Sequence, residues 1–298
     1  CSQGFEFSKS LPEFQFGLKQ GLGGPCGVLA AVQAEMLALI FFNDKNKDEE
    51  GKECNEGTGV GKNDGEMFPV FSSKKLHEIF AQALVEILIR STKEGNFIKL
   101  VSFTGSGLFK GFQNQISNQL KIHNFQNQSR ESIIEFITNN IEMYSAHHGC
   151  ILFLIGLLLT RGLEQINSDM DMDDTTLIGQ FGHCTQELVN LLLTGRATGN
   201  VMDGDVPMGD SGLTVRGVKK QSHIGYLTHL EALSMCQVGS FYKIPEVPVW
   251  VVGSSSHFTV LFCTDKKVNE ESDSEKLRTK VQRAFKSVDM DECGFIST

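Results

Sequence analysis

The stretch Gly23-Gly-Pro-Cys-Gly-Val-Leu-Ala-Ala-Val-Gln33, continued as far as Phe42, decides how this chain is interpreted. Its apolar residues recur with helical spacing, at Val28, Leu29, Val32, Met36, Leu39 and Ile40. The composition is also rich in strong helix formers. Because a helix tolerates proline in its first turn, Pro25 fits the start of such a helix. The sequence therefore predicts a buried helix that begins at or next to Cys26.

Further helices and strands are predicted on both sides of the middle of the chain. Helical periodicity returns over residues 74–91, 132–144, 149–166 and 186–194. Strands are expected late, over residues 240–244, 247–252 and 258–263. The last two are joined by a tight loop, and His257 stands at the start of the second. A helical half that carries Cys26 thus precedes a small antiparallel sheet that carries His257, which indicates an α+β fold.

The domain organisation follows from two polar stretches. Residues 43–66 are poor in apolar side chains and read as a flexible insertion within a domain over residues 1–266. Residues 267–298 are expected to hold a charged linker and the start of a truncated EF-hand-like segment. There Asp289 and Asp291 take positions one and three of a calcium loop, and Gly294 takes the turn position. Cys293 replaces the oxygen ligand of position five, so calcium binding is not expected from this stretch.

Composition narrows the functional class. The chain has 298 residues, of which 40% are hydrophobic and 21% charged, as in a soluble globular protein. Its net charge of −9 argues against a nucleic-acid surface. The most apolar run, residues 151–159, is far shorter than the roughly 20 residues that cross a bilayer, so no membrane partner is expected. We expect a monomer.

The eight cysteines contain no CxxC pair, which indicates neither a zinc site nor a disulfide framework. Reduced thiols are typical of the cytoplasm and the nucleus, where we expect the protein. His147, His148 and Cys150 resemble metal ligands, as do His183 and Cys184, but neither set has a second pair at ligand spacing. No metal and no cofactor are predicted. The acidic run from Asp169 to Asp174, and the aspartates Asp203, Asp205 and Asp210, are expected to be solvated.

A cysteine nucleophile needs a base and donors for the developing oxyanion. The start of a helix favours a thiolate, which Cys26 would gain from its position. His257 is the candidate base, and Gln20, six residues before Cys26, is the candidate oxyanion donor. Thr259 and Asp265 are both candidates for orienting His257. A lone cysteine or histidine is more often structural, so these residues alone predict only cysteine-peptidase-like chemistry.

The stretch around Cys26 resembles the MINDY family of deubiquitinases, and the likeness extends over most of the chain. The other segments that carry it are Gln3-Gly-Phe-Glu-Phe7 and residues 182–195, 200–204, 225–233 and 251–253. The EF-hand-like sequence that begins at Asp289 resembles the family member that carries an EF-hand-like insertion. The amino-acid sequence of the loop that carries Cys26 is closer to that of the fourth family member.

The resemblance implies a papain-like cysteine protease fold. It also implies hydrolysis of isopeptide bonds in polyubiquitin, with a preference for lysine-48-linked chains, and hence ubiquitin and polyubiquitin as partners. It carries over Cys26 as nucleophile, His257 as base and Gln20 as oxyanion donor. Two alternatives stay open: a catalytically inactive ubiquitin-binding module on the same fold, and a papain-like transferase or amidase with another substrate.

Overall fold

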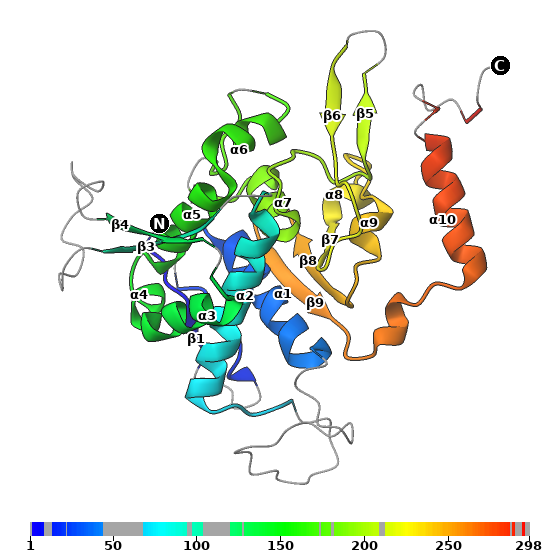
Figure 1. Ribbon diagram of the computed structural model, residues 1–298. Helices are drawn as coiled ribbons and strands as arrows, with labels where there is room; N and C mark the ends of the chain where they lie inside the picture. Colours follow the sequence, from blue (N-terminus) through cyan, green and yellow to red (C-terminus); the bar gives the residue numbers. More distant parts are fainter. Residues whose placement is uncertain are drawn as a thin grey trace. The chain divides into compact units, whose positions relative to one another are not determined.

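A computed structural model describes the chain over residues 2–8, 14–21, 23–43, 68–93, 97–103, 120–126, 128–172, 174–179, 182–208, 212–286, 288–289 and 294–295 (Figure 1). Residues 44–66 of the predicted insertion, and Asp291 and Cys293 of the EF-hand-like segment, lie outside these ranges. The chain forms two compact units, Cys1–Leu163 and Glu164–Thr298. The predicted boundary after residue 266 falls inside the second of them.

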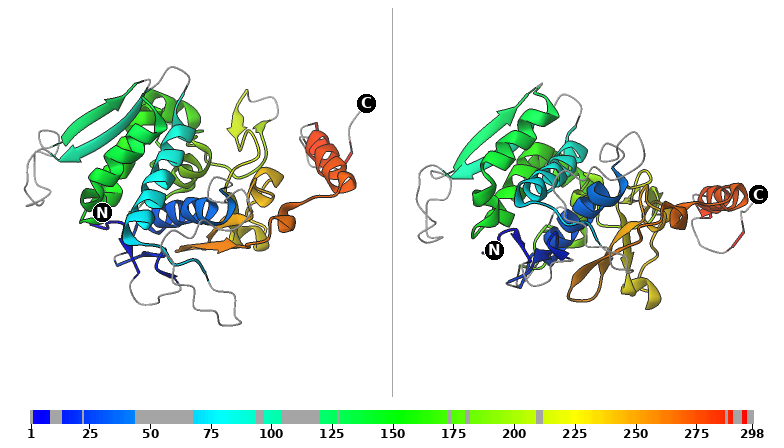
Figure 2. Two further views of the ribbon diagram at one scale, coloured as in Figure 1. Left: turned by 60° about the horizontal axis from the view of Figure 1, so that its bottom comes forward. Right: turned by 90° about the horizontal axis from the view of Figure 1, so that it is seen from below.

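The first unit is mainly helical. Its elements are β1 (Glu6–Phe7), β2 (Leu18–Lys19), α1 (Cys26–Phe42), α2 (Ser73–Ser91), β3 (Ile98–Phe103), β4 (Leu120–Phe125), α3 (Arg130–Asn139), α4 (Ile141–Ser145) and α5 (Gly149–Arg161). Helix α2 contacts α1, α3 and α5. Strands β1 and β2 form one antiparallel pair, and β3 and β4 form another. The β3–β4 pair lies against α5, which contacts β3 (Figure 2).

The predicted helix around Cys26 is confirmed as α1. Its apolar residues surround the axis, so nearly the whole helix is buried, as expected for a helix that is hydrophobic on every face. The one buried carboxylate, Glu35, is 1% exposed and pairs with Arg90 Nη2 of α2 at 2.7 Å. Gln33 Oε1 accepts a hydrogen bond of 2.6 Å from Leu18 N. Side-chain contacts therefore tie α1 to both α2 and β2.

Two predicted long helices are wrong in the same way, because each is broken by a residue that ends a helix. The stretch 132–144 divides at Asn140, whose side-chain amide donates to Phe136 O at 2.8 Å and competes with the backbone. The stretch 149–166 divides at Gly162, which has φ 87°. Helix α5 ends there, and α6 (Leu163–Asp169) follows as a separate helix.

Among the described residues, no single helix has both the length and the apolarity needed to cross a membrane. Helices α5 and α6 meet those criteria of length and composition only when counted as one bent pair.

The second unit holds the later helices and a three-stranded sheet. Its elements after α6 are α7 (Gln186–Thr194), β5 (Asp205–Pro207), β6 (Thr214–Arg216), β7 (Gly225–Thr228), α8 (His229–Ala232), α9 (Ser240–Lys243), β8 (Val249–Gly253), β9 (Phe258–Phe262), the 3-10 helix η6 (Lys266–Asn269) and α10 (Asp273–Lys286). The sheet order is β7-β8-β9. Strands β7 and β8 are parallel and β8 and β9 antiparallel, so the prediction of an antiparallel sheet is wrong for β7.

The strands on either side of the His257 loop are confirmed, with β8 and β9 shifted slightly from their predicted bounds. The strand expected over residues 240–244 is wrong, because this segment forms the short helix α9. The Asp203 carboxylate accepts from Ser240 N at 3.0 Å and from Phe241 N at 2.8 Å, which satisfies the first donors of a helix. Within residues 267–298, where a charged linker is expected, most of the described residues form η6 and α10.

Candidate active site

Cys26 is the first residue of α1, and its side chain is buried. The chain enters the helix through Gly24, at φ 118°, and Pro25, the N-cap residue. Only glycine adopts the Gly24 conformation without strain. The Cys26 Sγ lies 3.9 Å from Gly24 O, close enough for a weak hydrogen bond. The glycine and proline before Cys26 therefore fix where the thiol lies relative to the helix axis.

The start of α1 also offers hydrogen-bond donors beside the thiol. Pro25 O accepts from Val28 N at 3.0 Å and from Leu29 N at 3.1 Å. Within the described part of the chain, the N–H groups of Cys26 and Gly27 make no hydrogen bond, and no side chain caps the helix. Unpaired N–H groups at a helix start attract negative charge. This arrangement can stabilise both a thiolate and an oxyanion formed next to it.

Gln20 follows β2 directly, and its side chain is exposed. The backbone on either side of it is held by Gln3, a residue that sequence reasoning missed. Gln3 is 4% exposed; its Nε2 donates to Lys19 O at 3.2 Å, and its Oε1 accepts from Gly21 N at 2.9 Å. Gln3 thus holds the backbone of the residues immediately before and after Gln20. The only signal for it was its place in the segment Gln3–Phe7, which gave no hint of this contact.

His257 precedes β9 and is exposed, as is Thr259 two residues later. Ser254 N donates to His257 O at 2.8 Å, which closes the loop between β8 and β9. Among the described residues, neither Thr259 nor Asp265 forms a hydrogen bond to the His257 ring. The Asp265 carboxylate instead caps η6, accepting from Lys267 N at 2.9 Å. An orienting role for Thr259 stays a prediction.

Cys26 and Gln20 belong to the first unit, whereas His257 and Thr259 belong to the second. The shared proton between thiol and imidazole that the sequence predicts therefore stays a prediction.

Across the described ranges, no three or more His, Cys, Asp or Glu side chains gather as metal ligands. Burial and the neighbouring His147 lower the pKa of His148.

Two carboxylates that were expected to be solvated instead accept hydrogen bonds from other protein groups, so that prediction is wrong for them: Asp169 is buried and Asp203 is half-buried. Asp169 is fully buried and accepts from Ala197 N at 3.2 Å. The side chain of Asp203 is 11% exposed and accepts from the start of α9 and from Arg283 Nε at 3.1 Å. Polar loop sequence does not distinguish a solvated carboxylate from one that satisfies buried N–H groups.

The segments 182–195 and 200–204, which carry part of the family resemblance, are joined by hydrogen bonds of Asn190. This side chain is fully buried. Its Nδ2 donates to Thr198 O at 2.7 Å and to Asn200 O at 2.9 Å, and its Oδ1 accepts from the Tyr242 hydroxyl at 2.7 Å. Asn190 therefore joins α7, the loop before β5, and α9.

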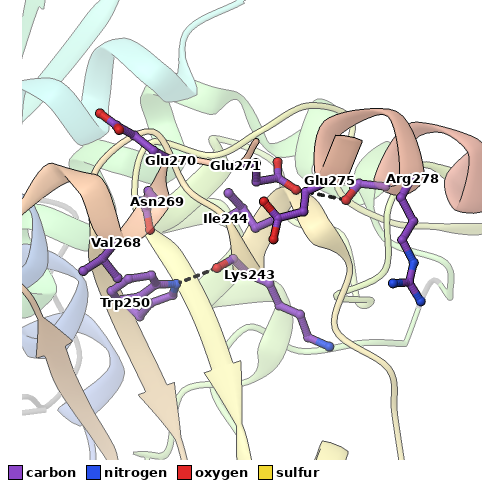
Figure 3. A pocket seen from close by; sticks show the side chains of 10 residues that line it. Lys243, Ile244, Trp250, Val268, Asn269, Glu270, Glu271, Glu275 and Arg278 are labelled. Carbon is purple, nitrogen blue, oxygen red and sulfur yellow. Dashed lines mark hydrogen bonds between the residues drawn. The ribbon is translucent and has the colours of Figure 1, made fainter. Parts of the chain in front are cut away.

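A cavity of about 330 Å³ lies in the second unit between β8, α9 and the start of α10 (Figure 3). Trp250 lines its wall and donates through its indole N–H to Lys243 O at 3.1 Å. Charged side chains from η6 and α10 also line it, together with Lys243: Glu270, Glu271, Glu275 and Arg278. The cavity contains none of the predicted catalytic residues. It is therefore separate from the chemistry expected at His257.

Comparison with known proteins gives a family match over almost the whole chain. The conserved domain of the deubiquitinating enzymes MINDY-3/4 matches residues 1–281. The chain is 35% identical over 284 residues to the mouse protein named probable ubiquitin carboxyl-terminal hydrolase MINDY-4, covering 92% of this chain and 36% of the relative. It is 33% identical over 309 residues to human ubiquitin carboxyl-terminal hydrolase MINDY-3, covering 99% of this chain and 66% of the relative.

The chain thus spans about a third of the MINDY-4 relatives and just under two thirds of the MINDY-3 relatives. No solved structure matches it. The match to both MINDY-3 and MINDY-4 agrees with the two subtypes that the sequence left open. On the family match and these identities together, the chain belongs to the MINDY-3/4 family of deubiquitinating enzymes.

Proposed function

We propose that this protein is a thiol-dependent deubiquitinase that hydrolyses isopeptide bonds in polyubiquitin, with a preference for lysine-48-linked chains, on a papain-like fold. The observation that carries the proposal is the position of Cys26. Its thiol stands at the first residue of a buried, firmly anchored helix, beside two N–H groups that have no partner in the described protein. The names of the MINDY-3 and MINDY-4 relatives support ubiquitin as the substrate.

The proposed reaction begins when His257 takes the proton of the Cys26 thiol. The thiolate attacks the carbonyl carbon of the C-terminal glycine of ubiquitin, and the carbonyl π electrons move to the oxygen. The Gln20 side-chain amide and the Cys26 N–H donate hydrogen bonds to this oxyanion. When the tetrahedral intermediate collapses, the C–N bond breaks and the imidazolium of His257 protonates the leaving lysine amine.

The thioester that results is cleaved by water. His257, now neutral, takes a proton from the water as the water oxygen attacks the thioester carbon. Collapse of this second intermediate breaks the C–S bond and restores the thiol, releasing ubiquitin with a free carboxylate. The cycle needs a reduced cysteine, which the cytoplasm and the nucleus maintain. We therefore propose that the protein acts in those compartments. We also propose that it acts as a monomer.

The glycines before Cys26 fit a glycine-terminated substrate. A Cβ atom added at Gly23 would meet no atom within 4 Å, so packing does not require glycine at this exposed position. Close approach of a substrate backbone would require it, because a side chain there would occupy the space through which an extended tail passes. The Gly-Gly end of ubiquitin is such a tail.

The nucleophile is tested with a ubiquitin probe that carries a C-terminal electrophile. We expect the wild-type chain to form a covalent adduct and Cys26→Ala to form none. Cys150→Ala is the matched control, because Cys150 is also buried and lies at the start of a helix, α5. An adduct retained in Cys26→Ala, or lost in Cys150→Ala, would contradict the assignment. Absence of any adduct in the wild-type protein would favour the inactive ubiquitin-binding module.

The base is tested by turnover of diubiquitins of each linkage. His257→Ala should lower kcat by about 10²- to 10⁴-fold, the range for loss of a general base. Wild-type turnover in His257→Ala would remove it from the mechanism. Fastest cleavage of a linkage other than lysine 48 would overturn the proposed preference. Cleavage of an unrelated peptide instead of ubiquitin would point to the transferase or amidase alternative.

The oxyanion donor is tested separately, because its loss should act on the transition state. Gln20→Ala should reduce kcat by about 10²- to 10³-fold, as for other side-chain donors to an oxyanion, and change KM much less. Gln20→Glu, which keeps the size of the side chain but removes its donor, should be equally impaired. An unchanged kcat in both variants would exclude Gln20 from this role.

A further inference from the structure

We propose that Ser254 is a positioning residue for His257. The Ser254 hydroxyl holds the backbone of this catalytic base through hydrogen bonds. This inference rests on the proposed function, in which His257 is that base. It concerns the loop between β8 and β9, which lies wholly within the second unit. Neither the sequence pattern nor the family match assigns any role to this serine.

The Ser254 hydroxyl bonds to both polar backbone groups of His257. It accepts from His257 N at 3.1 Å and donates to His257 O at 3.0 Å. The Ser254 backbone adds a third bond, from its N–H to His257 O at 2.8 Å. Three hydrogen bonds therefore join Ser254 to the backbone of the one residue on which the proposed proton transfers depend.

The loop needs this side chain because its backbone does not close in the usual way. Ser255 and Ser256 form a two-residue connection, and such connections normally adopt type I′ or II′ turns that require positive φ. In the described chain, the non-glycine residues with positive φ are His148 and Ser234, so neither loop serine has it. The His257 N–H, which such a turn would pair with a main-chain carbonyl, bonds to the Ser254 hydroxyl instead.

Packing does not hold His257 in place within its unit. Residues 254–257 are all exposed, whereas the strand residue Gly253 before them is buried. In the part of the chain that the structure describes, the Ser255 and Ser256 side chains make no hydrogen bond. The Ser254 hydroxyl is therefore the side-chain group that restrains the position of His257 in the loop.

Steady-state kinetics on lysine-48-linked diubiquitin test this role. A small misplacement of a catalytic group is costly, so Ser254→Ala should lower kcat by about 10- to 100-fold. KM should change by less than about twofold, because the loss falls on the transition state. Ser254→Thr keeps the hydroxyl and should recover most of kcat. Ser255→Ala is the matched control and should behave as wild type.

Thermal unfolding of each variant, and His257→Ala assayed in parallel, separate the possible outcomes. Wild-type kcat in Ser254→Ala, beside an inactive His257→Ala, would overturn this inference alone. Failure of Ser254→Thr to recover kcat, or an equal loss in Ser255→Ala, would show a general loop effect and overturn it too. Wild-type turnover in His257→Ala would instead overturn the proposed function on which the inference rests.

Discussion

Tyr144 and Tyr242 are both fully buried, but their hydroxyl groups differ in what they bond. The Tyr242 hydroxyl donates to Asn190 Oδ1 at 2.7 Å. The Tyr144 hydroxyl has no hydrogen-bond partner among the described residues, and burial raises the pKa of Tyr144. A buried hydroxyl without a partner loses its hydration and gains nothing in return. The two hydroxyl groups therefore have opposite effects on the free energy of unfolding.

We expect Tyr144→Phe to stabilise the protein by about 1 kcal/mol, because it removes the desolvation penalty of the hydroxyl and keeps the packed ring. Tyr242→Phe is the matched control and should destabilise it by about 1 kcal/mol, because it removes a bond to Asn190. Urea unfolding followed by circular dichroism measures both changes. Destabilisation by Tyr144→Phe would mean that its hydroxyl has a partner, and would contradict this reading.

At the scale of elements, Asp203 joins three segments that are distant in sequence. Its carboxylate caps α9 and accepts from Arg283 Nε of α10 at 3.1 Å. Arg283 also donates to Ser240 Oγ at 2.7 Å and lies 4.1 Å from the centre of the Phe241 ring. A guanidinium that stacks on an aromatic ring while bonding a carboxylate is well restrained. Arg283 therefore connects α10 to α9.

Most other side chains of α10 are exposed, including Leu277 and Val281. We therefore expect Arg283→Ala to release α10, and amide hydrogen exchange over residues 273–286 to rise by about tenfold or more, as for an element with few buried contacts. Exchange in α7 and β8 should not change. Lys280→Ala, an exposed position on the same helix, is the control and should leave α10 protected. Unchanged protection in Arg283→Ala would show that other contacts hold the helix.

The elements were predicted well where a pattern of consecutive residues causes them, and poorly where a single residue or a contact distant in sequence decides. The apolar residues of α1 and α2 recur with helical spacing along the sequence itself, and both predicted helices are confirmed. The breaks at Asn140 and Gly162 depend on single residues within otherwise helical patterns. The identity of α9 depends on a carboxylate from residue 203, which no inspection of residues 240–244 reveals. Parallel pairing of β7 with β8 is likewise a long-range event.

At the scale of the whole molecule, each unit contains a tyrosine whose pKa is raised by burial. These are Tyr144 in the first unit and Tyr226 in the second. An unfolded tyrosine has a pKa of about 10. A folded pKa above that value means that the folded state holds its proton more tightly. Ionisation of these two tyrosines therefore does not affect the free energy of unfolding below about pH 10, and it lowers that free energy as the pH rises further.

We therefore expect the free energy of unfolding to fall with increasing pH above about 10. Tyrosinate absorbance and circular dichroism, recorded together during an alkaline titration, check this. The absorbance of the buried tyrosines should appear only as the helical signal is lost. Tyr144→Phe should weaken the dependence on pH, because it removes one of the two groups. Complete tyrosine ionisation with an intact helical signal would contradict the expectation.

The sequence by itself determined the family, the α+β class and the helix that begins at Cys26, because these depend on residue order and on nearest neighbours along the chain. It also named Cys26, His257 and Gln20 as candidates. The tertiary structure decided which polar residues are buried, how Gln3 and Ser254 hold the backbone at Gln20 and His257, and why residues 240–244 form a helix. Each of these depends on hydrogen bonds made at particular positions in space. A buried donor or acceptor must find a partner in the folded chain, and sequence pattern does not say which residue will be there.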